Sequence, residues 1–180
     1  TQAIQMLHRP TPDVSLEELE AGTHPAQQRL AFEELVAHNL SMQKLRLQTQ
    51  QHPSVTIPVA QKLIDTFIGS LPFAPTQAQS RVVAEIQQDM NQPYPMMRLV
   101  QGDVGSGKTL VAALAALSAL QQGYQVALMA PTEILAEQHA INFANWFTPL
   151  GFKVDWLAGK LTAKQKREAQ ARIASGESQM

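Results

Sequence analysis

One stretch decides the fold: Gly102-Asp103-Val104-Gly105-Ser106-Gly107-Lys108-Thr109, which fits G-x-x-x-x-G-K-[ST] at every fixed position. Glycines tolerate positive φ and lack a Cβ, so such a loop can curl until successive backbone N–H groups point inward at an anion. Lys108 can bring a full charge to the β- and γ-phosphates, which makes it the candidate catalytic residue, and the Thr109 hydroxyl suits Mg²⁺. The stretch predicts that all eight residues bind the phosphates of a nucleoside triphosphate.

The segments on either side of this loop support the prediction. Met97–Val100 is a short apolar run that ends at the loop, and Leu110–Leu120 is apolar on every side, as expected of a helix buried under other elements. The pattern alone arises by chance in roughly half a percent of chains of this length. A glycine-rich turn without a ligand is the alternative, and the strand before and helix after weigh against it.

The alternation continues toward the C-terminus. Gln125–Ala130 and Phe152–Leu157 are strand-like, and helices are expected from Thr132 to about Phe147 and from Thr162 to about Ala174. Strands that alternate with helices imply a parallel sheet with right-handed crossovers. The predicted fold class is α/β, an incomplete P-loop NTPase (RecA-like) sheet preceded by an α-helical region.

The first 70 residues have a different composition, rich in Gln, Glu and Leu. A capping box at Ser15–Glu18 predicts a short helix, and further helices are expected from Pro25 to about Thr49 and over Val59–Ile68. We therefore expect residues 1–70 to be a helical connector and residues 71–180 to be the N-terminal part of the α/β domain.

Composition narrows the class of protein. The 180 residues are 44% hydrophobic and 16% charged, with no cysteine and a net charge of −1. No run approaches the ~20 apolar residues of a membrane span. No secretory pattern is present, and a cytoplasmic protein with no membrane partner is expected. Bulk charge does not indicate nucleic-acid binding, so any DNA contact must be local.

Several segments carry a resemblance to a known family. They are Leu71-Pro72-Phe73, Thr76-Gln77-Ala78-Gln79, Arg98-Leu99-Val100-Gln101 leading into the loop, Met129-Ala130-Pro131-Thr132-Glu133, and His24-Pro25-Ala26-Gln27. Together they resemble the motors of helicase superfamily 2, and within it the bacterial helicases of branched DNA. The resemblance covers most of the chain and is weakest after Phe143. It implies an ATP-dependent DNA helicase that remodels branched DNA and stalled forks in recombination and repair, with ATP and Mg²⁺ as cofactors.

The resemblance also implies roles for single residues. Gln79 would bind the adenine edge, although Thr76-x-x-Gln79 is equally a capping box that closes a helix. Pro131 and Thr132 would contact the DNA backbone, although Thr132 alone reads as a helix cap. A basic concentration could touch DNA or form a solvated helix face: Lys160, Lys164, Lys166, Arg167 and Arg172.

Three features of the family are not found in these residues. The DEx[HQ] carboxylates that hold Mg²⁺ and the attacking water do not occur before Met180, and neither do the second motor lobe with its arginine finger or the wedge domain. We therefore expect an inactive, monomeric piece whose parent acts on branched or duplex DNA together with the remaining motor and wedge domains. Another P-loop enzyme, such as a small-molecule kinase, or a non-enzymatic interaction module are the alternatives.

Overall fold

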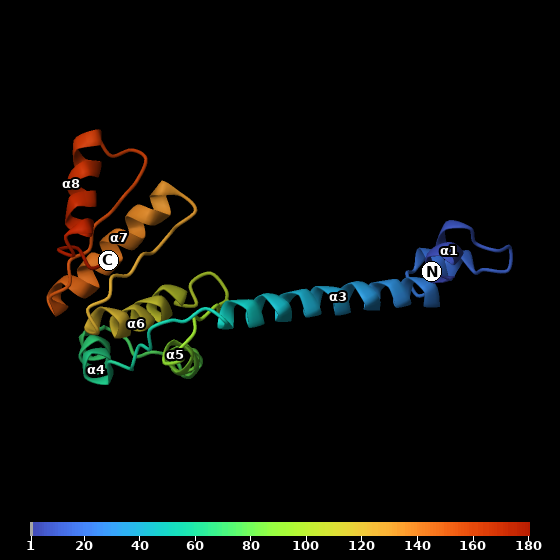
Figure 1. Ribbon diagram of the computed structural model, residues 1–180, viewed down its shortest axis with the longest axis horizontal. Coiled ribbons are helices and arrows are strands. Elements are labelled where there is room, and N and C mark those ends of the chain that lie inside the picture. The colour runs from blue at the N-terminus through green and yellow to red at the C-terminus, as the bar shows by residue number, and fades with distance from the viewer. Residues whose placement is uncertain (1) are drawn as a thin grey trace. The chain divides into compact units, whose positions relative to one another are not determined.

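The computed structural model describes residues 2–180, which fall into two compact units (Figure 1). The first ends at Pro53, and the second spans Ser54–Met180. The predicted boundary at residue 70 lies later than this division by one helix, α4 (Gln61–Ser70). That helix belongs to the second unit because Ile64 and Phe67 are buried in the core of that unit.

The first unit contains α1 (Gln2–His8), α2 (Leu16–Glu20) and α3 (Pro25–Gln50), and α1 packs against α3. The Ser15 hydroxyl caps α2 and the His24 imidazole caps α3, each accepting a hydrogen bond from a first-turn amide. These caps confirm the predicted starts of both helices, and they give His24 a structural role.

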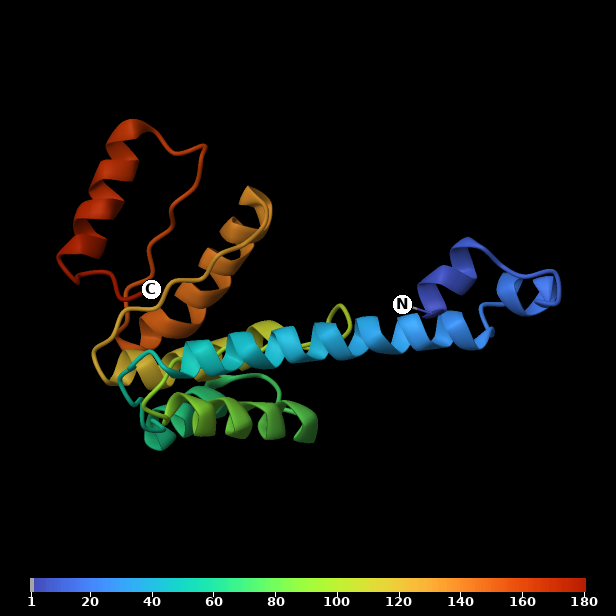
Figure 2. The same ribbon diagram turned by 45° about the vertical axis from the view of Figure 1, so that its right-hand side comes forward.

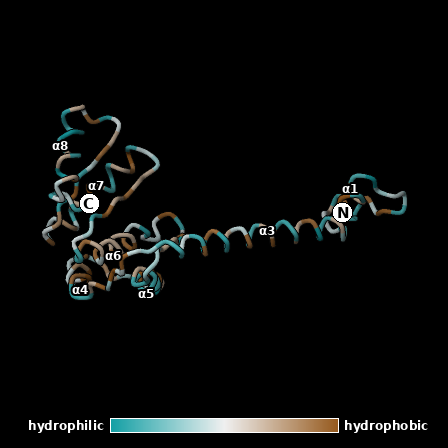
Figure 3. The backbone as a smooth tube through the Cα atoms, viewed as in Figure 1, coloured by the Kyte–Doolittle hydropathy of each residue, from teal (hydrophilic) through white to brown (hydrophobic). Residues whose placement is uncertain are grey.

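The long helix α3 buries little of its own surface within its unit. Ala26 is its buried residue, and the apolar side chains farther along are exposed: Phe32, Leu35, Val36, Leu40, Met42, Leu45 and Leu47. Figure 3 shows hydrophobic and hydrophilic stretches alternating along α3.

The second unit contains five α-helices and one short 3₁₀ helix (Figure 2): α4, α5 (Gln77–Met90), α6 (Lys108–Gln121), α7 (Glu133–Phe147), η1 (Thr148–Leu150) and α8 (Ala163–Ala174). Threonine hydroxyls cap α5, α7 and α8 at Thr76, Thr132 and Thr162. The helices predicted after the phosphate loop, after Thr132 and after Thr162 are confirmed.

Helix α6 is the centre of the hydrophobic core. Nine of its residues between Leu110 and Leu120 are buried, and α4 and α5 pack against it. An aromatic cluster extends the core to α7, where the Phe67 ring lies edge-on to Trp146 and Phe147 at centroid distances of 5.8 and 6.1 Å. The prediction that α6 is a buried helix is confirmed, and its N-terminus is held rigidly at the surface.

The predicted parallel sheet is wrong for this structure. Residues 2–180 contain no β-strand, and the segments expected as strands, 97–100, 125–130 and 152–157, run without a ladder of mutual hydrogen bonds. The predicted α/β class is thus replaced by an all-helical arrangement with extended connections. The physical reason is pairing: short, largely apolar segments between helices suggest strands, but a strand also requires a neighbour that takes up its N–H and C=O groups.

The C-terminal residues supply the backbone bonds that these extended segments do make. Val126 N donates to Gln179 O at 2.8 Å, and Asp155 N donates to Met180 O at 2.7 Å. Met180 N donates back to Lys153 O at 3.2 Å. Gln179 and Met180 thus connect the two extended segments by isolated backbone hydrogen bonds.

Candidate nucleotide-binding site

The phosphate loop has the curled shape that its sequence predicts. Gly105 and Gly107 adopt φ of 82° and 79°, in the left-handed region that favours glycine. A turn closes the loop through a hydrogen bond from Ser106 N to Asp103 O at 3.1 Å. On the other side of the loop, the Gly102 backbone lies close to the Ser106 side chain. A Cβ at Gly102 would come within 2.7 Å of the Ser106 hydroxyl. The loop is therefore wound tightly directly before α6.

The amides of this loop are available for a ligand. Of the backbone N–H groups from Gly102 to Thr109, Ser106 alone donates to a protein acceptor among residues 2–180. The loop residues from Gly102 to Ser106 are exposed, and α6 directs the positive end of its dipole at the loop. A concave group of free amides at a helix N-terminus is suited to an anion.

Lys108 lies across the loop. Its ammonium donates to the carbonyl oxygens of Gly102 and Asp103, both at 2.7 Å. An ammonium has three N–H donors, so one remains for a phosphate oxygen. The two carbonyls hold the charge of Lys108 over the loop, where an anion would meet it.

Gln79, at the start of α5, connects this helix to the phosphate loop. The sequence did not predict this connection. The Oε1 atom of Gln79 accepts from Thr76 N at 2.8 Å, and Thr76 Oγ1 accepts from Gln79 N at 3.2 Å, so the capping-box alternative is confirmed. The same side chain also donates from Nε2 to Ser106 O at 2.8 Å. No short-range signal could predict this contact, since the partners are 27 residues apart. Binding of adenine by Gln79 stays a prediction.

Arg98 ties the segment before the loop to the same helix. Its guanidinium donates to Asp89 at 2.8 Å and to Glu85 at 2.7 Å, two carboxylates one turn apart on α5. The hydrogen bond to Asp89 is the main reason why the pKa of Arg98 is raised. Helix α5 is thus bonded to the phosphate loop through Gln79 and to the segment before the loop through Arg98.

The residues predicted to contact DNA lie at the start of α7. The Thr132 hydroxyl accepts from Leu135 N at 3.3 Å, so its capping role is confirmed. Glu133 accepts from Lys160 N at 3.1 Å, and the Lys160 ammonium pairs with Glu137 at 2.6 Å. These bonds anchor the loop before α8 on α7. Contact of Pro131 and Thr132 with DNA stays a prediction.

Other members of the basic concentration are also engaged by the protein. The Arg172 guanidinium forms a two-pronged pair with Asp155, from Nε to Oδ2 at 2.8 Å and from Nη2 to Oδ1 at 2.7 Å. This pair lowers the pKa of Asp155 and raises the pKa of Arg172. Lys166 donates to Gly159 O at 2.9 Å. Most of these basic side chains therefore form bonds within the protein, which hold α8 and the loop before it against neighbouring segments.

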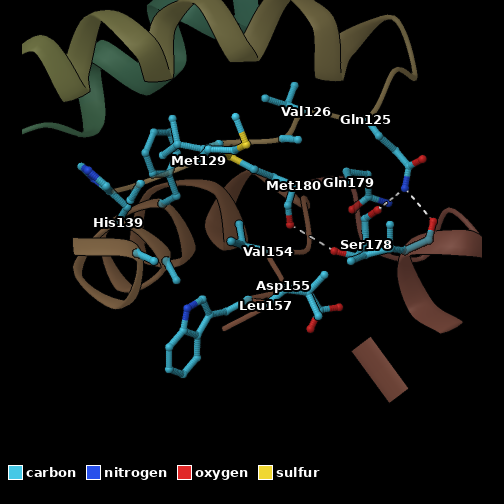
Figure 4. A pocket seen from close by; sticks show the side chains of 18 residues that line it. Gln125, Val126, Met129, His139, Val154, Asp155, Leu157, Ser178, Gln179 and Met180 are labelled. Carbon is cyan, nitrogen blue, oxygen red and sulfur yellow. Dashed lines mark hydrogen bonds between the residues drawn. The ribbon is translucent and has the colours of Figure 1, made fainter. Parts of the chain in front are cut away.

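A pocket of about 580 Å³ lies away from the phosphate loop (Figure 4). Its walls are the two extended segments, part of α7 and the C-terminal residues, and the labelled side chains include Val126, Met129 and Val154. Gln125 donates to Ser178 O across one end at 2.8 Å. This lining is mostly apolar and offers no arrangement for a triphosphate, which leaves the phosphate loop as the candidate site.

The protein offers few ligands to a metal ion at the phosphate loop. Among residues 2–180, no group of three or more His, Cys, Asp or Glu side chains could hold a metal ion by itself. Coordination of Mg²⁺ by the Thr109 hydroxyl stays a prediction. Within the same range, no helix has both the length and the apolar character to cross a bilayer.

The phosphate loop lies within a region that matches a known family. The DEAD/DEAH box helicase family matches residues 76–178, more than half of the chain and the range that holds the loop. The chain belongs to this family.

Its relatives share one name. It is 63% identical over 99% of its length to the ATP-dependent DNA helicase RecG of Pasteurella multocida, of which that match covers 26%. It is 42% identical over 98% of its length to the RecG of Bacillus subtilis, of which it covers 25%. A solved structure of RecG bound to a three-way DNA junction matches 95% of this chain with a TM-score of 0.76 and 40% identity, and 22% of that chain is covered. The chain thus spans about a quarter of the length of the relatives that it matches.

Proposed function

We propose that this chain is the ATP-binding part of an ATP-dependent DNA helicase that remodels branched DNA and stalled replication forks in recombination and repair. Membership of the helicase family and the shared name of the relatives support the proposal. The observation that carries it is the phosphate loop, with unpaired amides, a lysine donor to spare and a helix dipole behind it.

The loop is proposed to bind ATP with Mg²⁺. The unpaired amides between Gly102 and Thr109 would surround the phosphates, and Lys108 would keep its two carbonyl bonds while its third donor takes a γ-phosphate oxygen. The hydroxyl of Thr109 is a hard oxygen ligand of the kind Mg²⁺ prefers, and phosphate oxygens and water complete its coordination. Gln79 is proposed to lie beside the base.

The DNA contact is proposed at Pro131 and Thr132. The Thr132 hydroxyl accepts the capping bond and still has its own proton to donate, and the first amides of α7 are suited to a phosphate. The three-way DNA junction bound to RecG in the solved structure supports branched DNA as the partner class. In this proposal residues 1–70 are the connector, whose last helix α4 packs into the core of the second unit, and residues 71–180 are the first part of motor domain 1. The whole protein is proposed to be monomeric and cytoplasmic and to contain further motor and wedge domains.

Titration of a fluorescent ATP analogue tests the nucleotide proposal. Lys108→Ala should weaken binding roughly 10- to 150-fold, the effect of losing one charge-assisted hydrogen bond of about 1.5–3 kcal/mol. Lys166→Ala is the matched control, since its ammonium also bonds a carbonyl but lies on α8. Equal binding by the wild-type chain and Lys108→Ala would mean that the loop is idle and would overturn the proposal.

The DNA proposal has its own matched pair. Thr132→Val and Thr162→Val each remove one helix cap, and only the first is at the proposed contact. Fluorescence anisotropy with a labelled three-way junction should show weaker binding for Thr132→Val alone. Equal loss in both variants would attribute the effect to helix stability and remove the DNA role.

A further inference from the structure

The half-buried side chain of Gln79 is fixed at both ends of its amide. The carbonyl end closes the capping box of α5 by accepting from Thr76 N, and the amino end donates to the Ser106 carbonyl at 2.8 Å. The capping bond therefore orients the amide so that its N–H points at the phosphate loop. A side chain held in this way can impose an orientation on the peptide group that it contacts.

That peptide group belongs to the phosphate loop. The Ser106–Gly107 peptide is trans, so its C=O and its N–H point to opposite sides. Because Gln79 holds the Ser106 carbonyl on the outer side, the N–H of Gly107 points away from Gln79. Within residues 2–180 this N–H donates to no protein acceptor. It is one of the amides available to an anion.

The packing around Gly107 supports the same conclusion. A Cβ added at Gly107 would collide with Gln79 Nε2, so the amide lies directly against the glycine backbone. At Gly105, which has nearly the same φ, a Cβ would meet nothing within 4 Å. Gln79 thus fills the space beside one of the two positive-φ glycines and leaves the other open.

We propose that Gln79 is a positioning residue for phosphate binding: its amide holds the Ser106 carbonyl outward and thereby presents the Gly107 N–H to a phosphate oxygen. The inference rests on the proposed function, since it requires that the loop bind phosphates. It differs from binding of the base, because a group that orients a phosphate-binding amide acts on any polyphosphate, with or without adenine.

Inorganic tripolyphosphate separates the two roles. We suggest calorimetric titration of magnesium tripolyphosphate and of MgATP into the wild-type chain, Gln79→Met and Gln79→Glu. The Met variant removes both amide contacts, whereas Glu retains an acceptor for the capping box and loses the donor to Ser106. Gln165→Met is the matched control, because Gln165 closes the same kind of capping box with Thr162 at the start of α8, away from the loop.

The expected result is that Gln79→Met weakens tripolyphosphate binding about twofold to tenfold, as for loss of one neutral hydrogen bond, and weakens ATP binding by at least that factor. Gln79→Glu should weaken both ligands at least as much, because it also places a negative charge near the phosphates. Gln165→Met should bind both like the wild-type chain. Weaker ATP binding with unchanged tripolyphosphate binding would overturn the proposal and assign Gln79 to the base alone, and no change in either ligand would overturn it too. Failure of the proposed function has a different signature, namely that Lys108→Ala binds both ligands as tightly as wild type.

Discussion

Alanine at Gly107 and at Gly105 should weaken nucleotide binding to different extents. Both glycines have a φ near 80°, and an L-residue in the left-handed region costs about 1–2 kcal/mol. At Gly105 this strain is the whole effect, because a Cβ there has open space. Gly105→Ala should therefore reduce affinity for an ATP analogue roughly 5- to 30-fold.

Gly107→Ala should cost more because its Cβ also displaces Gln79. The collision with Nε2 breaks the hydrogen bond to Ser106 O, whose loss adds about 0.5–1.5 kcal/mol. The sum is about 1.5–3.5 kcal/mol, or roughly 10- to 400-fold in affinity. The difference between the two glycines thus measures the contact between the loop and α5.

A double-mutant cycle with Gln79→Ala tests this reasoning. Without the Gln79 amide the new Cβ at Gly107 has space, so Gly107→Ala should cost no more in that background than Gly105→Ala does in the wild-type chain. Fluorescence titration of the four combinations gives the coupling. Equal effects of the two glycine variants in the wild-type chain, or a Gly107→Ala effect that does not change when Gln79 is removed, would refute the argument.

Three further predictions concern stability and activity. In urea denaturation, Phe67→Ala should lower the free energy of unfolding by about 3–5 kcal/mol, because the Phe67 ring is fully buried. Phe73→Ala is the control: it alters an exposed ring and should change the free energy of unfolding by no more than about 0.5 kcal/mol. Asp155→Asn should cost about 1–2 kcal/mol at pH 7 by removing the charge that Arg172 binds. Folding lowers the pKa of Asp155, so its contribution to the free energy of unfolding is fully present above the unfolded pKa of about 3.9. This contribution is lost as the pH falls through the folded pKa. In urea denaturation the free energies of unfolding of wild type and Asp155→Asn should therefore converge as the pH falls below about 4. ATP hydrolysis by this chain should not rise above background when a three-way junction is added, since no carboxylate cluster accompanies Thr109 within residues 2–180; DNA-stimulated turnover would contradict this.

Most of the helices and the loop could be predicted from the sequence because their determinants are local, whereas α1 and the full length of α5 were not predicted. A threonine or serine followed three residues later by Gln or Glu fixes a helix start through bonds within one turn, as at Thr76 and Thr162. The curl at Gly105 and Gly107 follows from glycine's access to positive φ. Both features depend on neighbours a few residues away, which the sequence displays directly.

The sheet could not be predicted in the same way because a strand is defined by its partner. The composition of 125–130 and 152–157 indicates extended backbone, and both segments are extended without regular secondary structure. Their available partners, Gln179 and Met180, supply isolated bonds and no continuous ladder. Periodicity reports which face of a segment is apolar, and it carries no information on whether a neighbouring backbone is there to pair with it.

The contact between Gln79 and Ser106 shows the same division inside the candidate site. A capping box and an adenine-binding glutamine place the same residue type at the same position, so the sequence presented them as alternatives. In the structure the capping bond uses one end of the amide and thereby aims the other end at the phosphate loop. Closing the capping box thus orients Gln79 for its contact with Ser106. A glutamine at a helix start beside a phosphate loop can therefore cap the helix and contact the loop at the same time.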